Sequence, residues 1–370
     1  MNKKSTNATG RQANVSPLLL GTLAFGLLAA SSAALAQAPK DGRIGYVLTK
    51  RVWAIHESER GEVECPQGFN TGPREEYAML FPEDSGKTYT ELETRLMREG
   101  LAFHTTDETP LPFFDAQGPT AYGLNLDGEV GPEDFTNPEG EEGVDNQMYR
   151  AMGCINAYRT DGVIWFFATD DMYRNAYNRW LIELTNVDDL SNDDDVTVTT
   201  YRGLDELTRD GTGTAFIAGA TQQVDTRWGQ RFIEQFKGKI VDGVLTTDPV
   251  ESITIPWSQP GVSTGVYVVR DLQLRLDLTD KTADGLWAGY LDVNSFSHQL
   301  NTNWATHHQS YGQLSASSLH RAARRLADAY PDPETGKNTA ISTAVHVSFV
   351  QAHIDHPDDD TRVAGLEAPR

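Results

Sequence analysis

Basic residues are scarce in this chain of 370 residues, where 31 Lys and Arg face 53 Asp and Glu and the formal net charge is -22. Because nucleic acids are bound through Lys and Arg that neutralise phosphates, this balance argues against a nucleic-acid partner. The same imbalance disfavours binding to an anionic membrane surface. With 39% hydrophobic residues, the chain still has enough apolar side chains for one or two cores, as is typical of a globular protein.

Cysteine is nearly absent, and Cys65 and Cys154 form no Cys-x-x-Cys motif, so neither a redox pair nor an attached haem is indicated. The sequence also lacks a His-Glu-x-x-His zinc motif and a phosphate-binding glycine loop. Residues 261–265 match the Gly-x-Ser-x-Gly pattern of a nucleophile elbow, but that turn must lead into a helix. Since a strand-like run follows instead, we expect Ser263 to be a turn residue.

Long apolar runs are also missing, except within residues 1–36. There Lys3, Lys4 and Arg11 precede an apolar stretch that ends in Ala-Leu-Ala36, which is the pattern of a secretory signal peptide. We therefore expect cleavage near Ala36, a periplasmic or secreted protein, and no membrane span after cleavage. In an oxidising compartment two cysteines pair by default, so we predict a Cys65–Cys154 disulfide, with two separate buried thiols as the alternative.

The first half of the exported chain, residues 37–160, is expected to be a loop-rich α+β region. A capping box at Thr88 to Glu91 predicts a helix that ends near Gly100. Residues 107–143 are rich in Pro, Gly and acids and predict a long surface loop region, and residues 147–158 predict a helix.

Alternation with a period of two dominates residues 161–354. In the clearest strand, residues 271–279, four leucines alternate with polar residues, as in antiparallel sheets with one buried face. Further strands are expected at 163–167, 180–184, 196–198, 252–256, 266–270 and 341–354. Asp242-Gly243 and Asp284-Gly285 indicate turns, and residues 317–330 a helix.

These features predict a mainly β fold, an antiparallel β-sandwich or jelly roll with a few helices, α+β overall. Residues 226–237 fit either a helix or a strand, because Trp228, Phe232 and Phe236 recur at every fourth position. Residues 355–370 are expected to form a disordered acidic tail.

Residues 123–135 carry the sharpest local motif. They resemble an EF-hand calcium loop, with Asn125, Asp127, Gly128 and Asp134 at its third, fifth, sixth and twelfth positions. The resemblance implies a bound Ca²⁺ with the ligands Asn125, Asp127, Glu129 and Asp134. It covers the loop alone, and it departs from the family because Gly123 replaces the first Asp and Pro132 interrupts the loop. The alternative is an acidic surface turn.

Two neighbouring groups of acids bear on the calcium prediction. Asp145 and Asn146 could complete the loop site from outside, although we favour their capping the helix that follows. A second cluster lies between two expected strands, and its candidate calcium ligands are Asp188, Asp193, Asp194 and Asp195. Packed like charges favour a divalent cation there, and a solvated turn is an equal alternative.

Residues 285–311 gather aromatic and histidine side chains. Sugar rings stack on aromatic faces, so the candidate carbohydrate-binding residues are Trp287, Tyr290, Trp304 and Tyr311. The candidate acids and bases of a rival hydrolase function are Asp292, His298, His307 and His308. The leading hypothesis is a calcium-stabilised secreted β-protein that binds an extracellular carbohydrate. The alternatives are a hydrolase of glycans or esters and a structural envelope component.

Overall fold

The computed structural model describes residues 39–59, 61, 63–70, 113–160, 162–258, 265–299 and 316–357. Several predictions concern residues outside these ranges: the signal peptide, the helix near residues 88–100, Ser263 and most of the acidic tail. The candidate site residues Trp304, His307, His308 and Tyr311 also lie outside the described residues.

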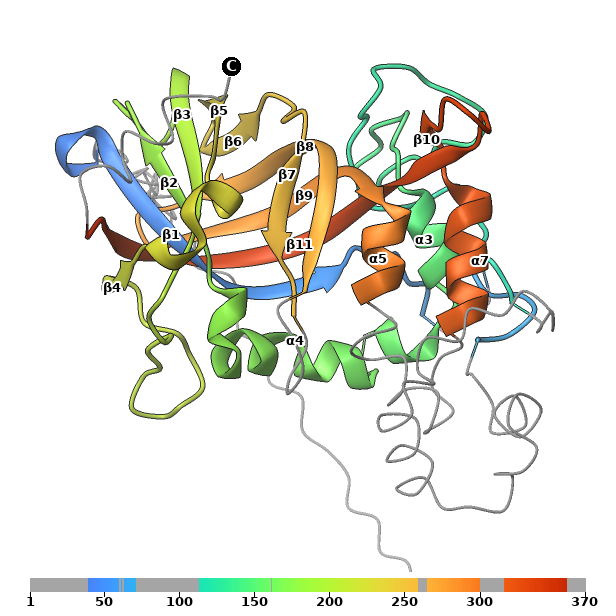
Figure 1. The fold of residues 1–370 in the computed structure, drawn as a ribbon, viewed down its shortest axis with the longest axis horizontal. Helices are drawn as coiled ribbons and strands as arrows, with labels where there is room; N and C mark the ends of the chain where they lie inside the picture. The colour runs from blue at the N-terminus through green and yellow to red at the C-terminus, as the bar shows by residue number, and fades with distance from the viewer. Residues whose placement is uncertain are drawn as a thin grey trace, which may run out of the picture. The chain divides into compact units, whose positions relative to one another are not determined.

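Eight antiparallel strands close into a barrel (Figure 1). In order around the barrel they are β1 (Arg43–Trp53), β2 (Trp180–Thr185), β3 (Asp193–Arg202), β5 (Glu234–Val241), β6 (Val244–Thr247), β8 (Val266–Leu278), β9 (Thr282–Asp292) and β11 (Asn338–Asp355). The barrel closes because β11 pairs with β1, where Phe349 lies opposite Leu48.

The mainly β content is as expected, but the prediction of a β-sandwich or jelly roll is wrong. Strands of a sandwich and of a barrel both bury every second side chain, so their sequence patterns are the same. The difference lies in the pairing of β1 with β11, two strands at opposite ends of the described chain. No local sequence pattern reports such a contact.

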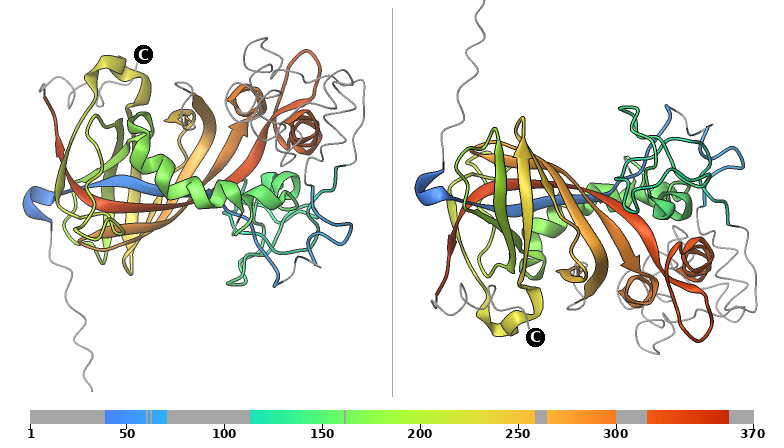
Figure 2. Two further views of the ribbon diagram at one scale, coloured as in Figure 1. Left: turned by 90° about the horizontal axis from the view of Figure 1, so that it is seen from below. Right: turned by 90° about the horizontal axis from the view of Figure 1, so that it is seen from above.

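Shorter elements surround the barrel. The added strands are β4 (Ala220–Gln223) and β10 (Ala329–Pro331), which pair with β11, and β7 (Ile253–Pro256), which pairs with β8. Beyond one end of the barrel lie α3 (Gln147–Met152), α5 (Val293–Gln299) and α7 (Ala316–Leu326), whereas α4 (Val163–Arg174) packs along β1 (Figure 2). The 3₁₀ turns are η1 (Lys40–Gly42), η4 (Asn156–Tyr158), η5 (Ala176–Asn178) and η6 (Thr226–Phe232).

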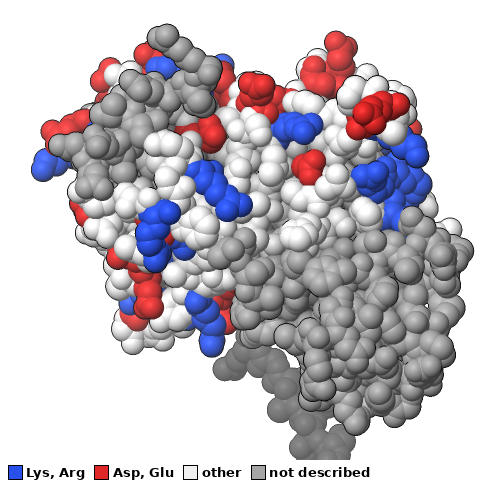
Figure 3. All heavy atoms as spheres, viewed as in Figure 1, with Lys and Arg blue, Asp and Glu red and all other residues white. Residues whose placement is uncertain are grey.

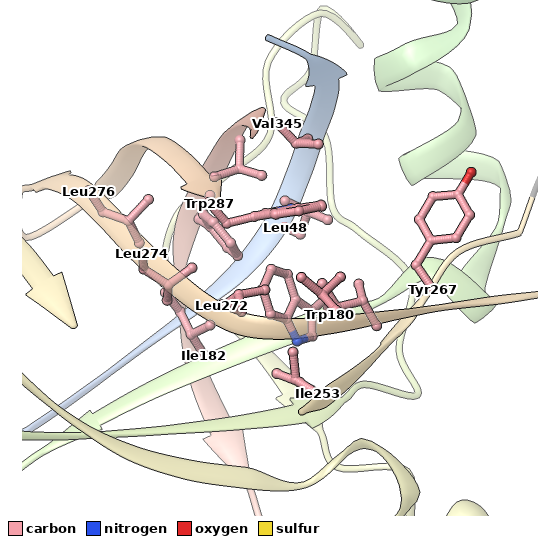
Figure 4. Packing of buried hydrophobic residues seen from close by; sticks show 14 of the residues in the cluster. Leu48, Trp180, Ile182, Ile253, Tyr267, Leu272, Leu274, Leu276, Trp287 and Val345 are labelled. Atoms are coloured by element: carbon pink, nitrogen blue, oxygen red, sulfur yellow. The ribbon is translucent and has the colours of Figure 1, made fainter. Parts of the chain in front are cut away.

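Apolar side chains fill the interior of the barrel. Leu272, Leu274 and Leu276 of β8 are fully buried, which confirms the predicted alternation. They converge with the indole rings of Trp180 and Trp287 from other strands (Figure 4). This barrel is therefore a packed core, unlike the wider barrels that enclose a ligand.

The two predicted turns have different outcomes. Asp242 and Gly243 both have positive φ, 51° and 84°, and connect β5 to β6 as a tight hairpin. The turn predicted at Asp284-Gly285 is wrong, because both residues lie within β9. A side chain at position 285 would collide with the backbone carbonyl of Arg275 in β8, so glycine permits close approach of two strands there.

The strand predicted at residues 163–167 is also wrong, because these residues begin helix α4. A short apolar run fits a buried strand and a buried helix equally well. The residues that follow show helical spacing: Ala168 and Met172 are buried four positions apart, and Asp170 pairs with Arg174 at 2.6 Å.

Two further segments, each expected to form one element, contain two elements each. Residues 226–237 begin as η6 and continue as β5, while the helix expected at 147–158 splits into α3 and η4. The late helix is confirmed as α7, which stops at Leu326 before β10 begins.

The predicted disulfide between Cys65 and Cys154 is present. It lies in a small apolar cluster with Phe135 and Tyr149, separate from the barrel core. Next to it, the buried Glu64 carboxylate accepts a 2.6 Å hydrogen bond from Arg159. The bridge therefore fastens the segment that follows β1 to the end of α3. Within the described ranges, no helix is both long and apolar enough to cross a membrane.

Candidate binding site at the closed end of the barrel

One end of the barrel is covered by three segments, residues 171–179, 225–232 and 256–258, which we call the closed end. Asn178 joins two of them: its side-chain amide donates to the Ser258 carbonyl at 2.6 Å and its side-chain oxygen accepts from the Ser258 N–H at 2.7 Å. Because Asn178 is completely buried, these bonds hold the end of β7 against η5 with little competition from water.

Buried arginines hold the closed end together. Arg179 donates to the last carbonyls of α4, and Arg202 donates to two carbonyls of η5. Carbonyls at the C-terminal end of a helix lack intrahelical partners and carry partial negative charge, so buried guanidinium groups satisfy them well. Arg202 also pairs with the buried carboxylate of Asp225. The two arginines thus fix the short segment that closes the barrel.

A third buried arginine, Arg51, faces Asp171 of α4. Its guanidinium stacks over the Trp257 ring at 3.7 Å and lies 3.5 Å from Oδ2 of Asp171. The same carboxylate oxygen accepts a 2.9 Å hydrogen bond from Asn178. The other oxygen of Asp171, Oδ1, is buried and has no hydrogen-bond partner among the described residues. This carboxylate is therefore only partly satisfied.

The surroundings shift the pKa of both groups. Burial raises the pKa of Asp171 from 3.8 to about 7, against the opposing effect of Arg51. Burial likewise lowers the pKa of Arg51 to about 10. Asp171 therefore gains and loses a proton near neutral pH, which is the property of a general acid or base.

The outer surface of the closed end presents an aromatic platform. Trp228 of η6 is half-buried, and its ring contacts Tyr177 at 5.5 Å and Phe232 at 5.7 Å, both edge to face. Asp225 caps η6 and also accepts from the exposed Arg227 at 2.7 Å. The indole is therefore held on a rigid support while part of its surface remains open to solvent.

Charge around this platform differs from that of the chain as a whole. Arg227 and Arg231 flank Trp228 and are both exposed. Figure 3 shows the face that bears η6, on which Lys and Arg side chains form small groups between acidic ones. A local excess of arginine in so acidic a protein points to a surface that binds a polar or anionic group.

The structure separates the described members of the predicted aromatic cluster. Trp287 is 1% exposed and lies inside the barrel, whereas Tyr290 points to the outside and packs on Tyr330. They therefore cannot present a common surface to a sugar. Asp292 ends β9 and caps α5 by accepting from the Ser295 N–H at 2.7 Å, while His298 lies in the last turn of α5.

In the loop that resembles an EF-hand, side-chain oxygens bind the loop's own backbone. Asn125 accepts from the Gly128 N–H, Asp127 from the N–H of Glu129, and Asp134 from the N–H of Gly131. Gly128 has a φ of 81°, so the sharp turn that the resemblance implies at this position is present.

Asp145 and Asn146 have separate roles beside this loop. Asn146 caps α3 by accepting from the Tyr149 N–H, as we favoured from the sequence. The cap that we also expected from Asp145 is wrong, because Asp145 accepts from the Leu126 N–H at 2.7 Å and so holds the start of the loop. Burial, together with the nearby charges of Asp127 and Asp134, raises the pKa of Asp145 to about 6.

The second acidic cluster forms the hairpin between β2 and β3. Both oxygens of Asp193 accept from backbone N–H groups, those of Asp188 and Asp195. Asp195 pairs with Lys237 at 2.6 Å, and Asp194 is exposed. Across the described residues, no group of three or more His, Cys, Asp and Glu is placed to hold a metal ion.

Sequence reasoning did not find the residues of the closed end. A usable signal was present at Arg227, Trp228 and Arg231, where two of the few basic residues flank a tryptophan. The buried pair of Arg51 and Asp171 had no such signal, because 120 positions separate them and each looks like an ordinary surface residue.

Comparison with protein-family models, with curated proteins and with solved structures finds no match for this chain. The chemistry of the closed end is therefore the basis for a functional assignment.

Proposed function

We propose that this protein binds an extracellular carbohydrate at the closed end of the barrel, with Trp228 as the stacking platform. The observation that carries the proposal is a half-buried indole ring held edge to face by Tyr177 and Phe232 on a short, well-anchored turn. Sugar rings have apolar faces that stack on such rings and hydroxyl groups that bind polar neighbours. A rigid platform also reduces the entropy lost when the ligand binds.

The platform replaces the one expected from the sequence near residue 287. There the indole of Trp287 is buried in the barrel, so no ligand reaches it. The chemical argument for sugars is the same, an aromatic face beside hydrogen-bonding groups, and only its location moves to η6.

Glycan binding by isothermal titration calorimetry and by quenching of tryptophan fluorescence tests the proposal. We expect saturable binding of at least one oligosaccharide from a broad panel, weakened about tenfold or more in Trp228→Ala. Trp165→Ala is the matched control, because Trp165 is also half-buried beside a cation, with Lys50 4.2 Å from its ring centre. Failure of the wild-type protein to bind any glycan, or an equal loss in the control, would contradict the proposal.

Calcium binding by residues 123–135 is a second candidate function. It is supported by the position of Asp145, a buried carboxylate that holds the start of the loop and whose pKa is raised first by burial and in addition by Asp127 and Asp134. A divalent cation would relieve this repulsion. After chelation, we expect added calcium, but not magnesium, to raise the melting temperature by mass action. The rise should vanish in Asp127→Ala and persist in Asp194→Ala, and no rise in the wild-type protein would rule the site out.

A further inference from the structure

The arginines around Trp228 differ in whether an acid neutralises them. Asp225 pairs with both Arg202 and Arg227, so those two guanidinium groups share one buried carboxylate. Arg231 is exposed and has no ion-pair partner among the described residues, although it lies 5.8 Å from the centre of the Trp228 ring. The platform therefore has at least one cation beside it whose charge no acid in the described residues offsets.

A second unsatisfied group lies behind the platform. The hydroxyl of Tyr177 is buried and has no hydrogen-bond partner in the part of the chain that the structure describes. Burial raises the pKa of this phenol, while the positive charges of Arg231 and Arg202 oppose the rise. The hydroxyl thus lies near Arg231 and behind the ring of Trp228, where solvent does not reach it. Tyr177 therefore supports the platform through its ring, and Arg231 is the group that can meet a ligand.

We infer that the ligand of the closed end is an acidic sugar whose carboxylate is bound by Arg231 while its ring stacks on Trp228. This inference rests on the proposed carbohydrate function and adds the class of sugar. A guanidinium group binds a planar carboxylate through two parallel hydrogen bonds. The chain's net charge of -22 repels anions in general, so an acidic ligand needs a local cluster of this kind.

Matched pairs of oligosaccharides test the inference. The probes are trimers of galacturonate, glucuronate and mannuronate, each compared with the neutral trimer made by reducing its carboxyl groups. For at least one pair, the wild-type protein should bind the acidic form at least tenfold more tightly. The ratio of the two affinities should fall to about one in Arg231→Gln, recover in part in Arg231→Lys, and stay unchanged in Tyr177→Phe, because the hydroxyl lost there is buried.

Arg209→Gln is the control, because Arg209 also stacks on an aromatic ring, that of Tyr173 at 3.8 Å, and its ring contacts among the described residues do not include Trp228. It should keep the wild-type ratio. Equal binding of acidic and neutral forms by the wild-type protein, or an unchanged ratio in Arg231→Gln, would overturn the inference and leave carbohydrate binding in place. Absence of binding to every probe and to the wider glycan panel would overturn both.

Discussion

Two buried aspartates, Asp171 at the closed end and Asp145 beside the loop of residues 123–135, are alike in exposure and opposite in surroundings. Each is 7% exposed, and burial raises the pKa of each, to about 7 and about 6. Asp171 faces Arg51 and nonetheless has the higher pKa. Asp145 has a backbone N–H donor but lies among other carboxylates.

The difference shows that a raised pKa alone does not say what neutralises a buried acid. Arg51 already lies beside Asp171 and would repel a metal cation. Asp171 therefore loses its negative charge by binding a proton. Asp145 has acidic neighbours, so a cation would stabilise it together with them. The closed end is thus suited to proton exchange, whereas cation binding by the loop stays a proposal.

The largest expected effect concerns the arginine that anchors the closed end. Arg202→Met leaves the buried Asp225 with one exposed partner and should lower the free energy of unfolding by about 3–5 kcal/mol. Arg227→Met removes the other partner of Asp225. Because the Arg227 side chain is 66% exposed, this change should lower the free energy of unfolding by no more than about 1 kcal/mol. Urea denaturation measures both, and equal losses would show that burial of the arginine does not matter.

The next largest effect is on the pH dependence of stability, in which Asp171 should differ from a surface acid. The pKa of Asp171 in the folded state lies above 3.8, the ordinary value for aspartate in the unfolded chain. Between these two values the folded protein holds a proton that the unfolded chain has released. Stability therefore falls as pH rises from about 4 to about 7. Asn at this position does not titrate, so Asp171→Asn should gain about 2–3 kcal/mol relative to wild type between pH 5 and pH 8.

Asp170→Asn, at the neighbouring position on the same helix, is the control for that experiment and should show no such gain. Denaturation midpoints at the two pH values are sufficient. Parallel pH profiles of wild type and Asp171→Asn would mean that Asp171 is ionised at low pH like a surface acid.

For Asp145 the same reasoning gives a smaller effect that calcium should modify. Its pKa of about 6 means that stability falls as pH rises from about 4 to about 6. Without calcium, Asp145→Asn should gain about 1–2 kcal/mol on the wild type between pH 5 and pH 8. Saturating calcium should cancel this gain if the loop binds the ion. An advantage of the same size with and without calcium would confine Asp145 to a structural role.

The smallest expected effect is that of Arg231→Gln on folding. Arg231 is exposed and has no ion-pair partner among the described residues, so its loss should change the free energy of unfolding by less than about 0.5 kcal/mol. Urea denaturation of the variant alongside Arg202→Met measures the difference. A large loss would place Arg231 with the arginines that hold the closed end together.

The sequence was informative wherever a local rule decides the structure. The alternation of Leu272 to Leu278, the Asp242-Gly243 hairpin and the pairing of Cys65 with Cys154 were all predicted correctly. Each depends on residues near one another in sequence or, for the cysteines, on there being only two. The strand predicted at residues 163–167 was wrong because an apolar run of that length fits either kind of element.

The candidate site could not be derived in the same way. Asn178, Arg179 and Arg202 look like surface residues in the sequence, since such side chains are seldom buried. They become interior residues only because helix and turn ends supply carbonyls for them to bind, and those ends meet only in the folded barrel. Trp228 was noted as one of three spaced aromatics, but its partial exposure depends on the path of η6, which buries Phe232 at its end and leaves Trp228 at the surface.

The pairing of β1 with β11 has a consequence for how this chain folds. The strand β1 pairs with residues around Phe349 that are synthesised long after it, so the barrel cannot close before β11 has been made. Contacts so distant in sequence slow folding, because a long loop must be closed before they contribute stability. Until then β1 has a row of unpaired backbone groups and is open to association with other chains. A truncation that removes β11 should therefore aggregate rather than leave a smaller folded protein.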